Sequence, residues 1–143
     1  EMPFEDWSRI IAVNLTSAIT GIQALLPSLR RSKAAKIIFI GSGSGLDNSG
    51  ARELAYTASK FGLRGVTHAL RENLRDDRIA VTCINPGYLG TITVEGGAAS
   101  ALGQQGGEII PPGDLIALVK CLIGMSNDSV VKEIDVSAMT DRI

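Results

Sequence analysis

Apolar residues recur at helical spacing over the first third of the chain. They follow one another at intervals of three or four residues from Trp7 to Leu29, and basic residues come directly after them. This spacing predicts a long amphipathic helix over about 5–31, because a period near 3.6 places such residues on one helix face. The same criterion predicts a second long helix over about 52–75. A third helix, over about 111–126, starts with two prolines, which favour a first helical turn.

Two short segments are apolar without alternation and rich in β-branched residues. KIIFIG (36–41) and RIAVTCIN (78–85) have this character, which is typical of strands buried on both faces of a parallel sheet, and VVKEIDVS (130–137) is predicted as a final strand. The order strand, long helix, strand, helix, strand predicts an α/β fold with right-handed crossovers. Residues 88–111 are glycine-rich, carry no clear pattern and are long for a plain connection. We expect a substrate lid there, or else a disordered surface loop.

Composition narrows the class of protein. The 143 residues are enough for one domain or a piece of one, with 45% apolar and 20% charged residues. The net charge of −1 supports neither a nucleic-acid partner nor an anionic membrane surface. No apolar run of about 18 residues and no signal peptide is visible, so we expect a cytoplasmic protein without a membrane span. The chain begins with Glu1 rather than Met, which suggests a fragment or a processed product.

Few residues are available for metal binding or for histidine-based catalysis. Cys83 and Cys121 are isolated within apolar segments, and we expect both to be reduced core cysteines rather than a disulfide or metal ligands. His68 is the only histidine, so a Ser-His-Asp triad or a histidine metal site has little to build on.

The loop KIIFIGSGSGLDNSG (36–50) could cradle a phosphate or present a serine hydroxyl. A dinucleotide fingerprint needs G-x-G-x-x-G at the start of a helix, and the two possible registers place Leu46 or Asn48 where the third glycine must stand. The spacing therefore argues against a phosphate cradle. The loop follows a strand, at the sheet edge where ligands of open α/β sheets bind, so a serine hydroxyl is the better hypothesis.

A tyrosine and a lysine one helical turn apart are the best candidates for proton transfer. Tyr56 and Lys60 stand at i and i+4 in YTASK, on one face of the second long helix. An ammonium at that distance favours the phenolate over the phenol, and a phenol tuned in this way can act as a general acid or base. Taken alone, the spacing is equally met by an aromatic contact with a solvated lysine.

Four segments in order, EDWSRIIAVNLTSAI, IIFIGSGSG, YTASK and INPGYLGT, resemble the short-chain dehydrogenase/reductases. The resemblance implies that residues 1–143 are the C-terminal catalytic half of one doubly wound, Rossmann-like parallel-sheet domain. It implies hydride transfer between NAD or NADP and a small carbonyl or alcohol substrate. The family's glycine-rich cofactor segment would precede Glu1, so NAD and NADP are not distinguished here, and the family's frequent D-G-G ending is absent.

The resemblance also implies roles for individual residues. Tyr56 matches the catalytic acid/base, and Lys60 matches the lysine that tunes it and binds the nicotinamide ribose. Asn14 matches an asparagine that holds a water of the proton relay. Ser42 matches the serine that orients the substrate oxygen, with Ser44 as its rival, because the distance from Ser42 to Tyr56 is one residue longer than the usual spacing. A helix-surface amide for Asn14 and a strand cap for Ser42 are the simpler alternatives.

The segment after the second strand matches the part of the family that contacts the nicotinamide. The residues implied in cofactor binding there are Pro86, Gly87, Leu89 and Thr91. The family also pairs its two long helices across a two-fold axis, so we expect a homodimer or homotetramer. Two other classes stay open: a truncated, non-catalytic half-domain that associates through its helices, and an extended-type sugar-nucleotide epimerase or dehydratase.

Overall fold

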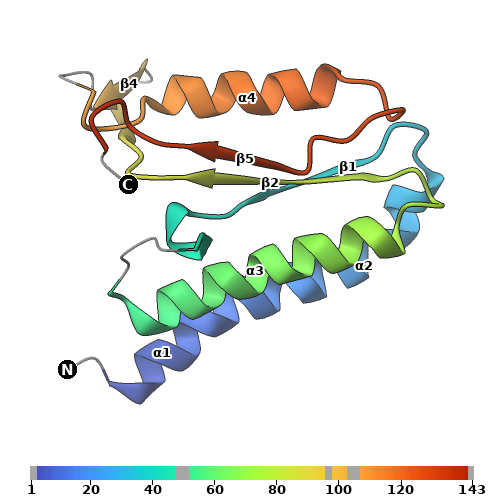
Figure 1. Ribbon diagram of the computed structural model, residues 1–143, viewed down its shortest axis with the longest axis horizontal. Coiled ribbons are helices and arrows are strands. Elements are labelled where there is room, and N and C mark those ends of the chain that lie inside the picture. Colours follow the sequence, from blue (N-terminus) through green and yellow to red (C-terminus); the bar gives the residue numbers. More distant parts are fainter. Residues whose placement is uncertain (1–2, 48–51, 96–97, 103–106, 142–143) are drawn as a thin grey trace.

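A three-stranded parallel sheet lies between helices on both faces, in the computed structural model of the chain (Figure 1). The α/β class predicted from the sequence is therefore confirmed. The sheet has the order β1-β2-β5, formed by β1 (Lys36–Ile40), β2 (Ala80–Pro86) and β5 (Glu133–Val136). The structure describes residues 3–47, 52–95, 98–102 and 107–141.

The middle strand β2 holds the sheet together, because it pairs in parallel with both neighbours. Ile37 aligns with Val81 on one side, and Ile84 aligns with Ile134 on the other. The β2 residues Val81, Cys83 and Ile84 are fully buried, as expected of a strand covered on both faces.

One continuous helical segment fills the first predicted helix, with one change of helix type inside it. It comprises α1 (Phe4–Ile11), a π-helical turn η1 (Ala12–Thr16) and α2 (Ser17–Arg31). The sequence pattern did not predict the π-helical turn, since one widened turn hardly disturbs an apolar stripe. Such turns occur often at functional sites.

The long helices cover one face of the sheet. The second predicted helix is α3 (Leu54–Asn73), which lies beside α1 and α2 below the sheet in Figure 1. An apolar core cluster lies between them and the sheet. Its buried residues are Ala35, Ile37, Leu74, Ile79 and Val81, and the half-buried residues packed on them are Ile22, Leu26, Leu29, Phe39 and Leu70.

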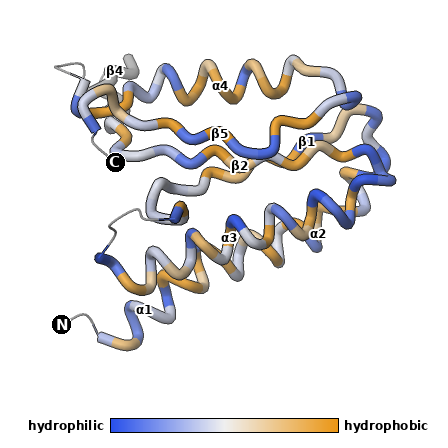
Figure 2. Tube along the Cα trace, viewed as in Figure 1, coloured by the Kyte–Doolittle hydropathy of each residue, from blue (hydrophilic) through white to orange (hydrophobic). Residues whose placement is uncertain are grey.

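The third predicted helix, α4 (Pro112–Gly124), covers the other face of the sheet. Hydrophobic residues recur along its whole length, as Figure 2 shows, but only Pro112 and Leu122 are buried. The expectation that both cysteines lie in the core is half wrong: Cys83 is buried, whereas Cys121 is exposed on α4. Because α4 is apolar all round its axis, its sequence pattern does not show which face turns inward.

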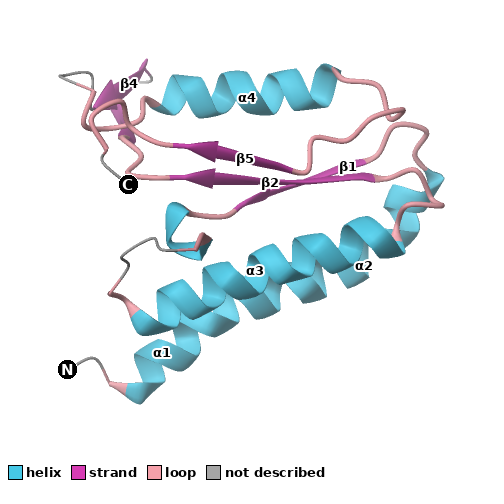
Figure 3. Cartoon of the chain, viewed as in Figure 1, coloured by secondary structure: helices cyan, strands magenta, loops and turns pink. Residues whose placement is uncertain are grey.

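The segment 88–111 contains strands that the sequence analysis did not predict. β3 (Thr91–Glu95) and β4 (Ala98–Leu102) pair antiparallel and form a separate two-stranded sheet, seen beside α4 in Figure 3. A further bridge joins Leu89 to Ile110. The expectation of an irregular segment was wrong, because TITVE alternates as a strand does and two glycines follow it, a common hairpin signal.

The first helical segment is also more apolar than the sequence analysis allowed. Phe4–Arg31 spans 28 residues, and its most apolar 18-residue window has a mean hydropathy of 1.5, enough by length and composition to cross a membrane. None of that window is buried inside this chain. Single polar residues interrupt the apolar run, so no unbroken stretch was visible, yet the window average stays high. Core helices of soluble proteins meet the same criterion.

Candidate active site

Lys60 ties helix α3 to the carboxyl end of β1. Its ammonium donates a 3.1 Å hydrogen bond to the carbonyl oxygen of Ile40, the last residue of that strand. The same nitrogen lies 5.5 Å from the ring centroid of Tyr56, one turn earlier on the helix. Tyr56 and Lys60 therefore share one face of α3, as their spacing predicted, and that face meets the end of the strand.

The serine loop begins two residues after Ile40, at the same edge of the sheet. Ser42 is buried and extended, and its Oγ accepts a 3.1 Å hydrogen bond from the backbone N–H of Ser44, capping the short 3-10 helix η2 (Gly43–Gly45). Because Ser42 Oγ is the acceptor in this bond, its hydroxyl proton remains available to donate another hydrogen bond. No hydrogen bond joins Ser42 to Tyr56 among the described residues.

Glycines let this loop lie directly against its neighbours. A Cβ at Gly45 would come within 3.0 Å of the Lys60 backbone, and a Cβ at Gly41 would come within 2.2 Å of Asn85 Oδ1. A real Cβ essentially never approaches as closely as at Gly41, and the distance at Gly45 is tighter than most real Cβ contacts, so glycine permits the close approach at both positions. The serine loop is thus held between α3 and the end of β2.

Asn14 reaches the same helix from the π-helical turn. Its Nδ2 donates a 3.1 Å hydrogen bond to Ser59 Oγ, and Ser59 Oγ donates a 2.6 Å bond to the backbone oxygen of Tyr56. The π-helical turn can lie close to α3 because Gly62 has no side chain: a Cβ there would lie 2.7 Å from a methyl of Leu15. The amide is therefore engaged with helix α3 and is not a plain surface group.

Ser59 is a site residue that the sequence analysis missed. It is completely buried, lies between Tyr56 and Lys60 in the sequence, and links Asn14 to the backbone oxygen of Tyr56. The sequence contained a signal for it, because a serine three residues after the tyrosine falls on the inward face of α3.

The segment after β2 lies beside the serine loop. Pro86 ends β2, and the N–H of Gly87 donates a 2.8 Å hydrogen bond to the carbonyl of Val136. A Cβ at Gly43 would lie 3.8 Å from Gly87, so the two turns face each other without side chains between them. Leu89 is fixed by its bridge to Ile110, as already described, and exposed Thr91 opens β3.

Buried Asn85 supports the end of β2 through hydrogen bonds to exposed Asp135 and buried Cys83. Asn85 is 2% exposed; its Nδ2 donates to Asp135 Oδ1 at 2.9 Å, and its Oδ1 accepts from the thiol of Cys83 at 3.2 Å. Burial raises the pKa of the Cys83 thiol, so this group stays protonated and serves as a donor. Asn85 thereby joins β2 to β5 directly beneath Gly41.

An ion pair joins α3 to the first residue of β5. Arg64 donates two hydrogen bonds to the Glu133 carboxylate, at 2.7 and 3.1 Å, and His68 Nε2 lies 3.2 Å from the same carboxylate. The guanidinium of Arg64 holds the pKa of Glu133 below its usual value, and Glu133 raises the pKa of Arg64. The pair fixes the helix that carries Tyr56 against the edge strand. Across the described residues, no group of three or more His, Cys, Asp or Glu side chains could hold a metal ion.

The chain is similar in sequence to dehydrogenases and reductases. The chain is 37% identical over 95 residues to the D-beta-hydroxybutyrate dehydrogenase of Rhizobium meliloti, an alignment covering 66% of this chain and 36% of that protein. It is 38% identical over 89 residues to the 3-oxoacyl-[acyl-carrier-protein] reductase FabG of Aggregatibacter actinomycetemcomitans, covering 61% of this chain and 36% of that one.

Solved structures extend the similarity over nearly the whole chain. A metagenomic short-chain oxidoreductase in complex with NADP superposes with a TM-score of 0.74 at 29% identity, over 98% of this chain and 54% of that protein. The chain thus spans about half the length of this solved relative. The sequence model described as short chain dehydrogenase matches residues 1–100. The chain belongs to the short-chain dehydrogenase family.

Proposed function

We propose that residues 1–143 form the catalytic half of a single-domain dehydrogenase or reductase that uses NAD or NADP to interconvert a carbonyl and an alcohol. One observation carries the proposal: the Lys60 ammonium lies between the Tyr56 ring and the last carbonyl of β1, directly before Ser42. A proton donor, a cation and a hydroxyl thus gather at the carboxyl edge of a parallel sheet, where ligands of this architecture bind. The family match supports the same reaction class.

In the proposed reaction Tyr56 moves the proton. Its hydroxyl gives a proton to the substrate oxygen during reduction and takes it back during oxidation, which is general acid/base catalysis. Lys60 places a positive charge 5.5 Å from the centre of the Tyr56 ring. Ser42 donates a hydrogen bond to the same substrate oxygen and fixes its position. Asn14, held on Ser59, keeps its amide oxygen free of hydrogen bonds to described residues, so that oxygen can hold a relay water beside Lys60.

The residues at this edge fit a nicotinamide nucleoside. The Lys60 ammonium has three donors and makes one hydrogen bond to the described residues, so donors remain for ribose hydroxyls. Gly43 and Gly87 face each other without side chains, which leaves backbone groups near Pro86 and Leu89 accessible to a carboxamide. Thr91 adds a hydroxyl at the start of β3. A bound nicotinamide supplies the hydride acceptor or donor, and the chain supplies position and charge.

The substrate and the assembly are parts of the same proposal. The similar proteins are named for a hydroxybutyrate and an oxoacyl substrate, so we propose a small hydroxy or oxo compound, covered by the 88–111 segment as a lid. The long helices expose apolar residues that a second copy would cover, and we propose a homodimer or homotetramer through them. These exposed residues are Phe4, Val13, Ile19, Leu25, Leu54 and Phe61.

The first test removes a single oxygen atom. Tyr56→Phe keeps the ring and its packing, so in the full-length protein the fold and cofactor affinity should persist. Turnover should fall about 100-fold or more if Tyr56 moves the proton. Near-normal turnover with intact cofactor binding would remove Tyr56 from the mechanism.

A second pair of variants decides between the two serines. Ser42→Ala should lower turnover strongly and also remove the cap of η2, whereas Ser44→Ala should leave turnover close to that of the parent, because only its backbone N–H is used. The opposite ranking would assign the substrate oxygen to Ser44.

A further inference from the structure

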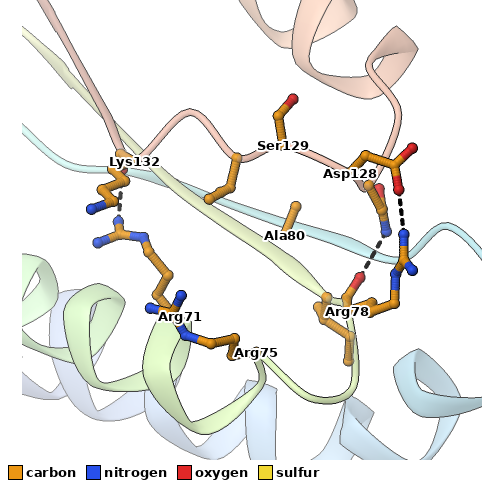
Figure 4. A pocket seen from close by; sticks show the side chains of 10 residues that line it. Arg71, Arg75, Arg78, Ala80, Asp128, Ser129 and Lys132 are labelled. Atoms are coloured by element: carbon orange, nitrogen blue, oxygen red, sulfur yellow. Dashed lines mark hydrogen bonds and ion pairs between the residues drawn. The ribbon is translucent and has the colours of Figure 1, made fainter.

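A cationic hollow lies at the end of the sheet opposite the candidate active site. The hollow has a volume of about 160 Å³ and sits between the turn after α3 and the loop after α4, at the amino end of β2 (Figure 4). Its wall contains charged, polar and apolar residues. The lining residues are Arg71, Arg75, Arg78, Ile79, Ala80, Asn127, Asp128, Ser129, Val130 and Lys132.

Positive charge dominates this wall. Four of the lining side chains are cationic and one, Asp128, is a carboxylate. Arg71 is held by carbonyl oxygens, at 3.1 Å from Val81 and 2.7 Å from Lys132, so its position is fixed while its charge stays uncompensated. Lys132 makes no ion pair with any described residue. Arg75 is partly neutralised, since it pairs with Glu72 outside the hollow at 2.6 Å.

Arg78 occupies a backbone conformation that usually requires glycine. Its φ is +55°, and it is the one described non-glycine residue with a positive φ. Left-handed backbone is unfavourable for a residue with a Cβ. Here it is maintained by a 2.9 Å hydrogen bond from Asn127 Nδ2 to the Arg78 carbonyl. The guanidinium then lies on the wall beside Asp128, with which it forms an ion pair. A strained residue that keeps a charged side chain in a hollow is typical of a functional site.

The rest of the lining fits an organic phosphate better than a bare ion. Ile79, Ala80 and Val130 supply an apolar part of the wall, and the exposed hydroxyl of Ser129 adds a donor. Guanidinium groups match phosphate oxygens in geometry and charge. We propose that this hollow is a binding site for the phosphate group of a small phosphate monoester, with Arg78, Arg71 and Lys132 around the phosphate. The site is separate from the proposed catalytic edge and does not depend on it.

The test titrates the full-length protein with phenyl phosphate by calorimetry, with and without saturating NADP so that competition at a cofactor site is visible. Inorganic phosphate and phenol are the comparison probes. We expect phenyl phosphate to bind with one site per chain irrespective of NADP, inorganic phosphate to bind more weakly, and phenol not to bind. Arg78→Gln should weaken phenyl phosphate binding at least about 10-fold, and the charge-matched control Arg9→Gln, on exposed α1, should leave it unchanged.

Two further variants make the result decisive. Asp128→Asn should tighten binding, because it releases the Arg78 guanidinium from its ion pair. Arg78→Gly should abolish most of the phenyl phosphate binding. It should also raise the unfolding midpoint, because glycine adopts the positive φ without strain. This variant replaces Arg78→Gln as the test if the glutamine variant folds poorly. Absence of binding, equal weakening by Arg78→Gln and Arg9→Gln, or displacement of phenyl phosphate by NADP would overturn the proposal.

Discussion

The side-chain amide of Asn14 donates a 3.1 Å hydrogen bond to the buried hydroxyl of Ser59, joining the π-helical turn to the catalytic helix. The Ser59 hydroxyl in turn donates a hydrogen bond to the backbone carbonyl oxygen of Tyr56. Each of Asn14→Ala and Ser59→Ala should therefore lower the free energy of unfolding by about 1–2 kcal/mol, because a buried polar group loses its partner. The double variant should lower the free energy of unfolding by about 1 kcal/mol less than the sum of the two single effects. Urea unfolding of all four proteins measures this coupling, and strict additivity would mean that the bond contributes nothing.

Lys60 should contribute to both turnover and cofactor binding. Lys60→Met removes the charge and keeps most of the aliphatic stem, so the site loses a cation 5.5 Å from the Tyr56 ring and a donor for ribose hydroxyls. Turnover should fall and cofactor should bind more weakly. Lys33→Met, at an exposed position away from the site, is the matched control. Turnover and cofactor affinity equal to those of the parent would leave Lys60 without the proposed role.

The Arg64–Glu133 pair should make stability depend on acid. The pKa of Glu133 is lowered in the fold from its ordinary value of 4.5, so the unfolded chain binds the proton more readily. The stabilisation is therefore complete above pH 4.5 and is lost as the pH falls toward the lower, folded value. Glu133→Gln should cost about 1–3 kcal/mol at pH 7, and the difference from the parent should shrink below pH 4.5.

The matched control for this ion pair is Glu72→Gln. Glu72 also has a lowered pKa, because Arg75 bonds to it, but the pair is on the surface. Exposed pairs contribute little. Glu72→Gln should therefore change the denaturation midpoint much less than Glu133→Gln, and equal effects would assign the pH dependence to surface charge in general.

Association should depend on the exposed apolar face of α2. Ile19 is 47% exposed on that helix, and a glutamate there would put a charge into an apolar interface. Sedimentation of the full-length protein at tens of micromolar should show at least a dimer, and Ile19→Glu should yield monomer. Ser28→Glu adds the same charge at an exposed polar position on another face of α2 and should leave the dimer intact. A monodisperse parent monomer would contradict the proposed assembly.

The isolated chain should bind cofactor poorly. It spans 54% of the solved relative that holds NADP, and no glycine-rich dinucleotide fingerprint occurs in its 143 residues. Residues 1–143 alone should bind NAD or NADP no tighter than about millimolar, or about −4 kcal/mol. Calorimetry on folded 1–143, with folding checked by circular dichroism, measures this. Micromolar binding would show that the main cofactor contacts lie within these residues.

The helices and the parallel strands could be predicted because their patterns reflect burial. Strand β2 is apolar without alternation because both of its faces are covered, and the 3.6-residue period of the long helices reflects one covered face. Tyr56 and Lys60 could be paired because their spacing is one helical turn. Their position at the end of β1 followed from the parallel order of the sheet.

Other features depend on contacts that a local pattern does not encode. β4 is alanine-rich and lacks the β-branched residues that mark a strand, so it forms only through pairing with β3. Cys121 lies on a helix that is apolar all round, and only packing determines which face is inside. The positive φ of Arg78 depends on a bond from Asn127, 49 residues later.

The central position of β2 has a consequence for how the protein folds. Lys36 pairs with Ala80 and Cys83 pairs with Glu133, so every pairing within the parallel sheet joins segments that are far apart in the sequence. Parallel pairing of this kind closes long loops before any contact is gained, which makes folding slow. Ser42 and Tyr56 are brought to the same edge only when β1 has docked on β2 and α3 has packed beneath them. The candidate active-site edge is therefore complete only after this long-range docking, and a change that loosens β2 should delay folding and the appearance of activity together.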